Sequence, residues 1–326
     1  MGVEPVRWGF LSTAKINDHV LNGARKSDRL EVVAVASRDQ RRAEDYARER
    51  GIPRAHGSYE ALLEDPEIDA VYISLPNSLH VEWSIRALEA GKHVLCEKPL
   101  DRRPERVAEA FDAADRAGRF LMEGFMYRHH PQMLRLRALI DEGAIGELRM
   151  ISTVHAFHLT RLDDVRLKPE LDGGSLMDVG CYCVNAARFL AGEPVAAAGE
   201  QVLTPGGVDV RFAGVLRFPG DVVAHFDSAF DVPARRWLEA AGSEGAVFVP
   251  DAWVIDKWGL ELRRPGAGPE WIEVEKRNKY NLELENLSAA IRGEAEPLLG
   301  RDDALGQARA IDALYRAAET GRTIAL

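Results

Sequence analysis

The sequence lacks the features that mark membrane, secreted and nucleic-acid-binding proteins. It has no run of about 18 apolar residues that could span a bilayer. It does not open with a basic segment followed by an apolar stretch and a cleavage site. Its net charge of -10 provides no basic excess to attract nucleic acids or anionic lipids. We therefore expect no nucleic-acid or membrane partner, and a cytoplasmic location.

Cysteine is scarce, and low-complexity tracts, internal repeats and long linkers are absent. The three cysteines are Cys96, Cys181 and Cys183. An odd number without a Cys-x-x-Cys spacing predicts neither a disulfide framework nor a paired metal site. We interpret all three as reduced, small apolar residues, and we expect no bound metal.

The composition is that of an ordinary globular protein, with 46% hydrophobic and 29% charged residues. At 326 residues the chain is longer than a single hydrophobic core usually grows, which predicts two domains. The pattern changes around Glu123–Pro131. We place a dinucleotide-binding domain over residues 1–124 and a substrate-binding and oligomerisation domain over residues 125–326.

The two halves differ in their order of strands and helices. In the first half, apolar strands such as Val6–Leu11 and Leu30–Ala36 alternate with helices, which predicts an α/β fold with a doubly wound parallel sheet of the Rossmann type. In the second half, short strands separated by Pro-Gly and Gly-rich turns predict an α+β domain with a large open, mainly antiparallel sheet. One face of that sheet needs cover from helices or a second subunit, so we expect a homodimer or homotetramer.

The turn after the first strand carries a partial dinucleotide motif. It reads Gly-x-Leu-x-x-Ala where the fingerprint is Gly-x-Gly-x-x-Gly/Ala, so that Gly9 supplies the turn and Ala14 the close packing, while Leu11 replaces the middle glycine. We expect a hydroxyl side chain here to cap the following helix, and the amides of Ser12 and Thr13 to form an anion site. The alternative is an ordinary strand-to-helix turn.

The end of the second strand indicates which cofactor binds. In such folds this point meets the adenosine ribose, where an acid suits a free 2′-hydroxyl and an arginine suits a 2′-phosphate. Arg38, with Ser37 beside it and Arg42 one turn later, favours NADP. Asp39 leaves NAD possible, and in the alternative interpretation the helix arginines coat a solvated face.

Two further strand ends carry polar residues at the same predicted edge of the sheet. Leu75, Pro76, Asn77 and His80 follow one strand, and Glu97-Lys98-Pro99 follows the next. A charged pair that closes a buried strand is costly without partners, and ligands bind at this edge in open α/β sheets. We interpret both segments as parts of a site. The alternatives are a surface ion pair and, for His80, an ordinary residue at a helix start.

A second chemical feature follows Gly173-Gly174, where we predict a helix from Leu176 to Leu190. Asp178 and Tyr182 are four residues apart and would share a helix face. They form a candidate proton-transfer pair, although a tyrosine with its ordinary pKa of about 10 needs a nearby ammonium such as that of Lys98. The alternative is a tyrosine hydrogen-bonded to the aspartate for packing. We interpret Arg161, Arg166 and Tyr280 as surface or packing residues, although they could line a pocket.

Four segments together resemble the glucose-fructose oxidoreductase, inositol dehydrogenase and MocA (Gfo/Idh/MocA) family of NAD(P)-dependent oxidoreductases. They are Glu97–Pro99, Leu75–His80, Met122–Gln132 and Gly173–Tyr182. The resemblance covers almost the whole chain. It is strongest to the branch that holds NADP-dependent D-xylose 1-dehydrogenases and trans-1,2-dihydrobenzene-1,2-diol dehydrogenases.

The resemblance implies hydride transfer between the nicotinamide of NADP, or of NAD, and a hydroxyl-bearing carbon of a sugar or cyclic diol. Lys98 matches the catalytic lysine, with a cis bond to Pro99, and Tyr182 matches the acid/base. Asp178 matches a carboxylate that orients the substrate, while Glu97 and Arg128 are expected near the cofactor. The alternatives are a ketoreductase of modified or nucleotide-linked sugars and an NADP-binding sensor without turnover.

Overall fold

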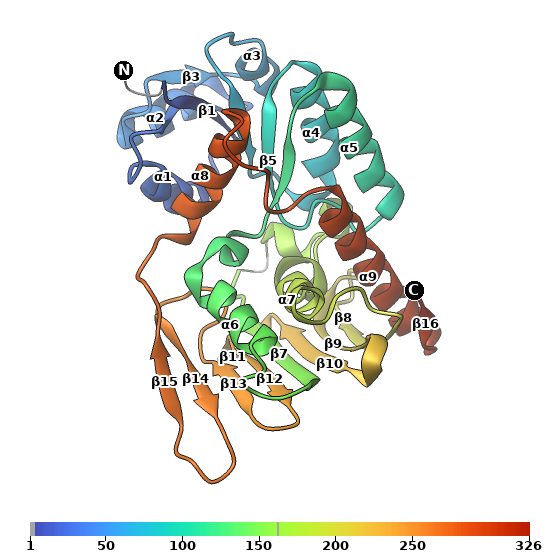
Figure 1. The fold of residues 1–326 in the computed structure, drawn as a ribbon. Coiled ribbons are helices and arrows are strands. Elements are labelled where there is room, and N and C mark those ends of the chain that lie inside the picture. Colours follow the sequence, from blue (N-terminus) through green and yellow to red (C-terminus); the bar gives the residue numbers. More distant parts are fainter. Residues whose placement is uncertain (1–3, 162) are drawn as a thin grey trace. The chain divides into compact units, whose positions relative to one another are not determined.

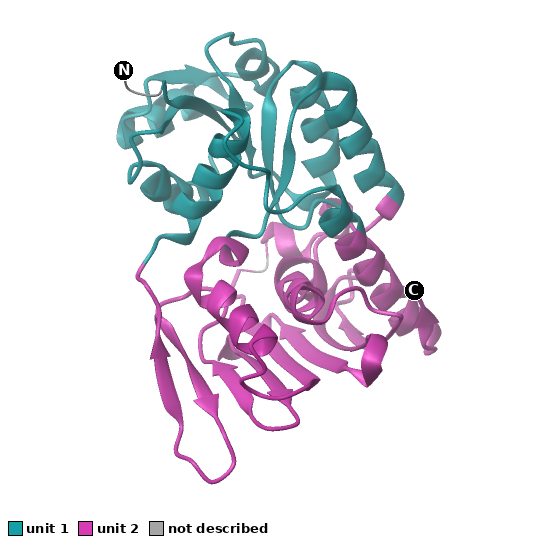
Figure 2. Cartoon of the chain, viewed as in Figure 1, with its two compact units in different colours: residues 1–101, 105–126, 277–305 teal, residues 102–104, 127–276, 306–326 magenta. Residues whose placement is uncertain are grey.

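The computed structural model describes residues 4–161 and 163–326 and divides into two compact units (Figure 2). The first unit contains the chain up to residue 101 together with residues 105–126 and 277–305. The second contains residues 102–104, 127–276 and 306–326. The boundary predicted between residues 124 and 125 is close to the end of the first unit at Met126. Residues 277–305 were predicted to be part of the second domain, but they belong to the first unit.

The first unit is built on a parallel sheet (Figure 1). Over the described residues its six strands lie in the order β3-β2-β1-β4-β5-β6. Strands β1, β2, β4 and β5 are largely apolar and mostly buried, as expected for parallel strands that are covered on both faces. The predicted doubly wound sheet is confirmed. The strands are β1 (Val6–Leu11), β2 (Leu30–Ala36), β3 (Arg54–His56), β4 (Ala70–Ile73), β5 (His93–Glu97) and β6 (Leu121–Gly124).

Helices connect these strands, and local signals fix their ends. Asp39 caps helix α2, because its side chain accepts a hydrogen bond from the Arg42 amide, and Gly51 ends that helix with a φ of 63°. The helices of this unit are α1 (Asn17–Ala24), α2 (Gln40–Arg50), α3 (Tyr59–Leu63), α4 (His80–Glu89), α5 (Pro104–Ala117) and α8 (Lys279–Ile291), with the 3₁₀ turn η1 (Asn77–Leu79) before α4.

Helix α8 explains why residues 277–305 belong to the first unit. The Trp8 indole nitrogen donates to Ser288 Oγ at 3.2 Å, and Asn281 Nδ2 donates to the Gly23 carbonyl at 3.1 Å. A Cβ on Gly23 would stand 2.7 Å from the backbone nitrogen of Asn281. The close approach of α1 and α8 therefore depends on the missing side chain at position 23. The sequence could not show that the partner of α8 lies near the start of the chain.

The second unit is built on a large open sheet. Within the described residues its ten strands follow the path β15-β14-β13-β12-β7-β10-β9-β8-β16, with β11 paired to β7. The pairs are antiparallel except for β7 with β10, which confirms the predicted mainly antiparallel sheet. The strands are β7 (Leu148–His158), β8 (Ala196–Leu203), β9 (Asp209–Arg217), β10 (Val223–Ala229), β11 (Asp231–Arg235), β12 (Leu238–Gly242), β13 (Ala246–Val249), β14 (Gly259–Arg263), β15 (Glu270–Glu273) and β16 (Ile324–Ala325).

Helices of the second unit include α6 (Pro131–Asp141), α7 (Cys181–Ala191) and most of α9 (Arg301–Thr320). The helix predicted from Leu176 is α-helical only from Cys181, because a π-helix, η5 (Leu176–Gly180), forms its first turn. Short 3₁₀ turns complete the unit: η2 (Met126–His129), η3 (Val165–Leu167), η4 (Pro169–Leu171) and η6 (Pro219–Asp221). None of the helices in the described ranges is long and apolar enough to cross a membrane.

Candidate functional site

The turn after β1 differs in detail from the dinucleotide motif. Gly9 lies inside the strand, where an added Cβ would stand 2.9 Å from Leu62 Cδ2, so the missing side chain serves packing against α3. The left-handed residue of the turn is Ser12, with a φ of 119°. A non-glycine residue in this region is strained and persists only where its surroundings hold it. The expectation that Gly9 supplies the turn was therefore wrong.

Ser12 is held by hydrogen bonds to two other elements. Its hydroxyl donates to the Ser74 carbonyl at 3.1 Å and accepts from the Ala14 amide at 3.1 Å. Asn17 Nδ2 donates to the Ser12 carbonyl at 2.8 Å. Helix α1 begins only at Asn17, and Ile16, its N-cap, makes no side-chain cap. The predicted hydroxyl cap was wrong because the Ser12 hydroxyl bonds to the end of β4 and to its own turn.

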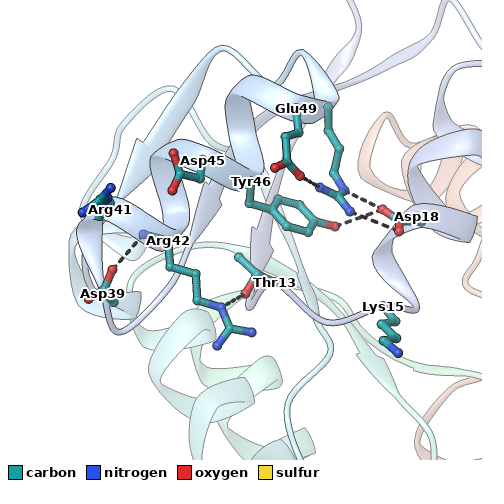
Figure 3. A pocket seen from close by; sticks show the side chains of 10 residues that line it. Thr13, Lys15, Asp18, Asp39, Arg41, Arg42, Asp45, Tyr46 and Glu49 are labelled. Atoms are coloured by element: carbon teal, nitrogen blue, oxygen red, sulfur yellow. Dashed lines mark hydrogen bonds and ion pairs between the residues drawn. The ribbon is translucent and has the colours of Figure 1, made fainter.

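A hollow of about 430 Å³ lies beside this turn, within the first unit (Figure 3). Arg42 Nε donates to Thr13 Oγ1 at 2.8 Å, which connects α2 to the turn (Figure 3). The charged side chains that line the hollow are of both signs: Lys15, Arg41, Arg42 and Arg50, and Asp18, Asp39, Asp45 and Glu49. Arg50 pairs with Asp18 at 2.6 Å, so the other three basic groups are the better placed to meet an added phosphate.

The residues after β2 fit a phosphorylated ribose better than a free one. Asp39, the residue that left NAD possible, accepts the Arg42 amide at 2.7 Å as the cap of α2. Ser37 is buried at the strand end, and Arg38 is exposed. Burial raises the pKa of Tyr59, while the charges of Arg38 and Arg42 oppose that shift. Both arginines therefore lie near one tyrosine, on the same side of the unit as Thr13.

The segments after β4 and β5 are joined by His80. Leu75 and Pro76 lead from β4 into η1, which begins at Asn77, and α4 begins at His80. The His80 ring is 1% exposed, with Nδ1 2.8 Å from the Pro99 carbonyl oxygen and Nε2 2.8 Å from the Leu75 carbonyl oxygen. Burial lowers its pKa, and the two carbonyls oppose that shift. We expected His80 to bind the cofactor, but both ring nitrogens lie within hydrogen-bond distance of main-chain carbonyl oxygens.

The turn around Lys98 is fixed from two sides. Strand β5 ends at Glu97, and the Lys98-Pro99 peptide bond is cis. The Leu100 amide donates to Glu123 Oε1 at 2.7 Å, and Glu123, on β6, is 1% exposed. His80 holds the Pro99 carbonyl from the other side. Two buried side chains thus position the turn that carries Lys98 without being part of it.

A buried group of acids and tyrosines lies next to this turn, and sequence reasoning missed it. Tyr72 Oη donates to Glu97 Oε1 at 2.5 Å. Glu283 on α8 is 1% exposed, and among the described residues its Oε1 has no hydrogen-bond partner. Burial raises the pKa of Glu283, the charge of Glu97 raises it further, and Lys279 opposes the shift. The fold therefore favours the neutral form of Glu283. Its position four residues before Leu287, on the apolar face of α8, was the available sequence signal.

Tyr182 lies at the start of α7 in the second unit, where aromatic rings surround it. The centroid of its ring is 5.2 Å from that of His155, 5.7 Å from that of Tyr127 and 5.8 Å from that of Trp253. Such contacts stabilise a ring in one orientation. Tyr182 is 6% exposed, and Trp253 is fully buried, with its indole nitrogen donating to the Val154 carbonyl at 2.8 Å. The aromatic cluster thus fixes the phenol that the sequence singled out.

Asp178 lies in the π-helix, one turn before Tyr182. Arg166 Nε donates to Asp178 Oδ2 at 2.7 Å, and the charge of Asp178 raises the pKa of Arg166. Arg166, interpreted as a surface or packing residue, therefore orients this carboxylate. Arg161 does lie at the surface, where it pairs with Asp163 at 3.0 Å.

Arg128 was expected near the cofactor, but its described contacts are with α7 in the second unit. Its Nη1 donates to Asn185 Oδ1 at 3.1 Å, and the guanidinium carbon is 4.1 Å from the centroid of the Phe189 ring. The side chain is 8% exposed. The assignment of Arg128 near the cofactor stays a prediction.

The cysteines and the metal-ligating residue types show no further site. Cys96, Cys181 and Cys183 are buried free thiols, and burial raises the pKa of Cys183 to about 12. In the part of the chain that the structure describes, no group of three or more His, Cys, Asp or Glu side chains is arranged to hold a metal ion.

Glu283 predicts a pH-dependent stability. A carboxyl with a raised folded-state pKa makes folding increasingly costly as pH rises above its ordinary value of 4.5, because the unfolded chain then ionises more readily. Glu283→Gln is neutral at every pH. We expect it to raise the free energy of unfolding by roughly 1–3 kcal/mol at pH 8, and by less at pH 5. Urea denaturation at the two pH values measures the difference.

The matched control for this prediction is Glu296→Gln, an exposed residue of the same segment 277–305. It should show no such pH-dependent gain. If Glu283→Gln lost the same stability at both pH values, Glu283 would be an ionised partner in the fold rather than a neutral one.

Comparison with known proteins places these features in a family. A family model described as "Oxidoreductase family, NAD-binding Rossmann fold" matches residues 6–125, and the "GFO/IDH/MocA C-terminal domain" matches residues 133–248. D-xylose 1-dehydrogenase (NADP(+)) 2 of Haloferax volcanii is 38% identical over 98% of this chain and 99% of its own.

Two solved structures are similar along almost the whole chain. An aldose-aldose oxidoreductase from Caulobacter crescentus, complexed with glycerol, has a TM-score of 0.92 and 31% identity, covering 99% of this chain and 100% of its own. A 3-ketoreductase from Actinomadura kijaniata, in complex with NADP and TDP-benzene, has a TM-score of 0.90 and 28% identity, covering 96% of this chain and 98% of its own.

That ketoreductase has also been solved with one lysine replaced by alanine and, separately, with one tyrosine replaced by phenylalanine. These two positions are as far apart in its sequence as Lys98 and Tyr182 are here. With family models that together span most of the chain and a relative at 38% identity, the chain belongs to the Gfo/Idh/MocA family of oxidoreductases with an NAD-binding Rossmann fold.

Proposed function

We propose that the protein is an NADP-dependent oxidoreductase that transfers a hydride between nicotinamide and a hydroxyl-bearing carbon of a sugar or cyclic diol. The observation that carries the proposal is the turn around Lys98, which His80 and Glu123 hold at the end of β5. A protein that only bound the dinucleotide would not need a lysine positioned in this way together with the buried phenol of Tyr182.

Each residue has a separate role in the proposed chemistry. When bound, the nicotinamide accepts the hydride in oxidation and supplies it in reduction. In oxidation, Tyr182 takes the proton of the substrate hydroxyl as the hydride leaves the carbon, and Lys98 binds the same oxygen. A neighbouring ammonium lowers a phenol's pKa, which makes the tyrosine a competent base near neutral pH. Asp178, oriented by Arg166, binds a second hydroxyl.

The proposed cofactor site uses residues of the first unit. The backbone of Gly9 to Ala14, including Leu11, provides the strand-end turn, and Leu75, Pro76, Asn77, Glu97 and Lys98 complete the nicotinamide end. Ser37, Arg38 and Arg42 bind the 2′-phosphate. The hydrogen bond from Arg42 to Thr13 and the use of Asp39 as a helix cap support NADP over NAD. The Haloferax volcanii relative is named for NADP.

Replacing Lys98 tests the catalytic assignment. We expect Lys98→Met and Tyr182→Phe each to reduce kcat by about 100- to 10,000-fold, because Tyr182 takes the proton and Lys98 lowers the pKa of that phenol and binds the same substrate oxygen. NADPH affinity, measured by tryptophan fluorescence quenching, should change little. Lys257→Met, an exposed lysine of the second unit, is the control and should retain full turnover. Unchanged turnover in Lys98→Met would refute the proposal.

Cofactor selection is tested at the two arginines. Arg38→Ala and Arg42→Ala should each weaken NADPH binding by roughly 10- to 100-fold, the range for loss of one charge-assisted hydrogen bond, while NADH binding stays the same. Arg48→Ala, an exposed residue later on the same helix as Arg42 and outside the lining of the hollow, serves as the matched control. An equal loss for NADPH and NADH in these variants would show that the arginines do not contact the 2′-phosphate.

A ketoreductase of nucleotide-linked sugars is the second candidate. It is favoured by the Actinomadura kijaniata relative, whose complex contains TDP-benzene. A panel of free aldoses, cyclic diols and nucleotide-linked keto sugars, each with the matching cofactor, separates the two candidates by kcat/KM. Tight NADPH binding with no turnover across the panel would favour a sensor.

We propose that a second copy of this chain covers the open face of the second unit's sheet. Helices α6, α7 and α9 lie on one side of the sheet (Figure 1). The strand residues whose side chains face the other side of the sheet include exposed apolar ones: Met150 is 45% exposed, Val202 44% and Val215 40%. A dimer that buried this face would remove such side chains from water.

Sedimentation velocity at micromolar concentration tests this assembly. We expect a dimer or tetramer for the wild type and a shift to monomer for Val215→Lys, which places a charge on this face. Leu134→Lys changes a leucine on α6 that is 50% exposed and should leave the assembly unchanged. A wild-type protein that sediments only as a monomer would contradict the proposal.

A further inference from the structure

A buried carboxylate in the second unit joins three separate elements. Asp209, the first residue of β9, is 2% exposed. Its Oδ2 accepts from Ser175 Oγ and from the Leu176 amide, both at 2.8 Å, and its Oδ1 accepts from Tyr315 Oη at 2.9 Å. Burial raises the pKa of Asp209, and these hydrogen bonds oppose the shift. A buried carboxylate is tolerated only when its oxygens are satisfied in this way.

The backbone next to Asp209 is shaped around this carboxylate. Gly174 has a φ of 132°, and a Cβ at this position would collide with Asp209 Oδ1. The Gly174 carbonyl in turn accepts the Asp178 amide at 2.9 Å. The chain therefore enters the π-helix at a point where a glycine and a carboxylate are required together.

The π-helix that follows sets the register of Asp178 and Tyr182. A π-turn is closed by hydrogen bonds from residue i+5 to residue i and often occurs at functional sites. Here the Cys181 amide donates to the Leu176 carbonyl. The Leu176 amide thus donates to Asp209, and the Leu176 carbonyl accepts from Cys181, the residue before Tyr182. Asp209 binds the residue at which the wide turn begins.

The C-terminal end of the π-helix, at Gly180, packs against the same group of polar residues. Ser228 Oγ lies 3.2 Å from Ser175 Oγ, and a Cβ on Gly180 would stand 2.8 Å from Ser228 Oγ. Tyr315, on α9, packs its ring edge-on against Phe212 at a centroid distance of 5.8 Å. The first turn before Tyr182 is therefore tied to β9, β10 and α9 at once.

We propose that Asp209 is a positioning residue for the reaction: it anchors the start of the π-helix through Ser175 and Leu176, and so fixes where Asp178 and Tyr182 stand. This inference rests on the proposed function, in which those two residues bind and deprotonate the substrate. Asp209 touches neither substrate nor cofactor. Its effect is on geometry, and misplacement of a reacting group by about 1 Å can reduce turnover by about 100-fold.

Two substitutions at position 209 separate anchoring from charge. In Asp209→Asn the remaining oxygen can still accept from Ser175 and Leu176, and the new NH2 group can donate to the Tyr315 hydroxyl. In Asp209→Ala all three bonds are lost. We expect Asp209→Ala to lower kcat by about 10- to 100-fold, and Asp209→Asn to remain within about threefold of wild type. NADPH affinity should be unchanged in both, since its proposed ligands lie in the first unit.

Hydrogen exchange measured by mass spectrometry provides a readout that needs no substrate. We expect peptides over residues 174–182 to exchange faster in Asp209→Ala than in wild type, and to be protected again in Asp209→Asn. Leu262→Ala, a buried residue of β14 that is 3% exposed, controls for general loss of stability. It should lower the melting temperature without changing kcat or exchange at residues 174–182.

The outcomes separate the failure of this inference from the failure of the proposed function. If Tyr182→Phe retains turnover, the assignment of Tyr182 is wrong. If Tyr182→Phe is inactive while Asp209→Ala shows wild-type kcat and wild-type exchange at residues 174–182, the anchoring role is overturned. If Asp209→Ala does not fold, Ser175→Ala carries the test, because it removes one of the three bonds. A Ser175→Ala protein with unchanged exchange at residues 174–182 overturns the proposal in the same way.

Discussion

Hydrogen bonds between buried polar side chains and main-chain atoms hold the segments that carry the chemistry in both units. His80 binds the Leu75 and Pro99 carbonyls, Glu123 binds the Leu100 amide, and Asp209 binds the Leu176 amide. None of the three is assigned a step in the reaction. A buried polar group that lacks a partner is costly, so each bond also resists movement of the segment it holds. The proposed reacting residues can then occupy a turn and a π-helix that would not keep their conformation without these hydrogen bonds.

Two of the buried carboxyls outside the proposed reaction, Asp209 and Glu283, show how hydrogen-bond donors act on a buried acid. Asp209 accepts from three donors, which oppose the rise that burial causes in its pKa. Among the described residues, the buried Oε1 of Glu283 has no donor, and the charge of Glu97 adds to the rise in its pKa, so its neutral form is favoured. Burial acts on both in the same direction, so the surrounding donors make the difference.

Sequence patterns predicted the parts of the fold that depend on local composition. The continuous apolar runs of β1, β2 and β5 specify parallel strands, and the residue types in Glu97-Lys98-Pro99 marked the edge of the sheet where a ligand would bind. The patterns could not predict that Ser12 would take the left-handed position or that Gly9 would serve packing, because both depend on contacts with Ser74 and Leu62 far along the chain. The π-helix was missed for a similar reason, since Asp209, which binds its first residue, lies more than thirty residues after Leu176.

Residues 277–305 complete the first unit from late in the chain, and this constrains how the protein can be made. Trp8 is fully buried and gives its indole proton to Ser288, and the glycine face of α1 is closed by Asn281. During synthesis the ribosome must therefore extend nearly the entire polypeptide before the nucleotide-binding half acquires its last helix. Until then that half exposes an unfinished surface to chaperones and to aggregation. A gene fragment encoding residues 1–126 alone would produce the same unfinished species permanently.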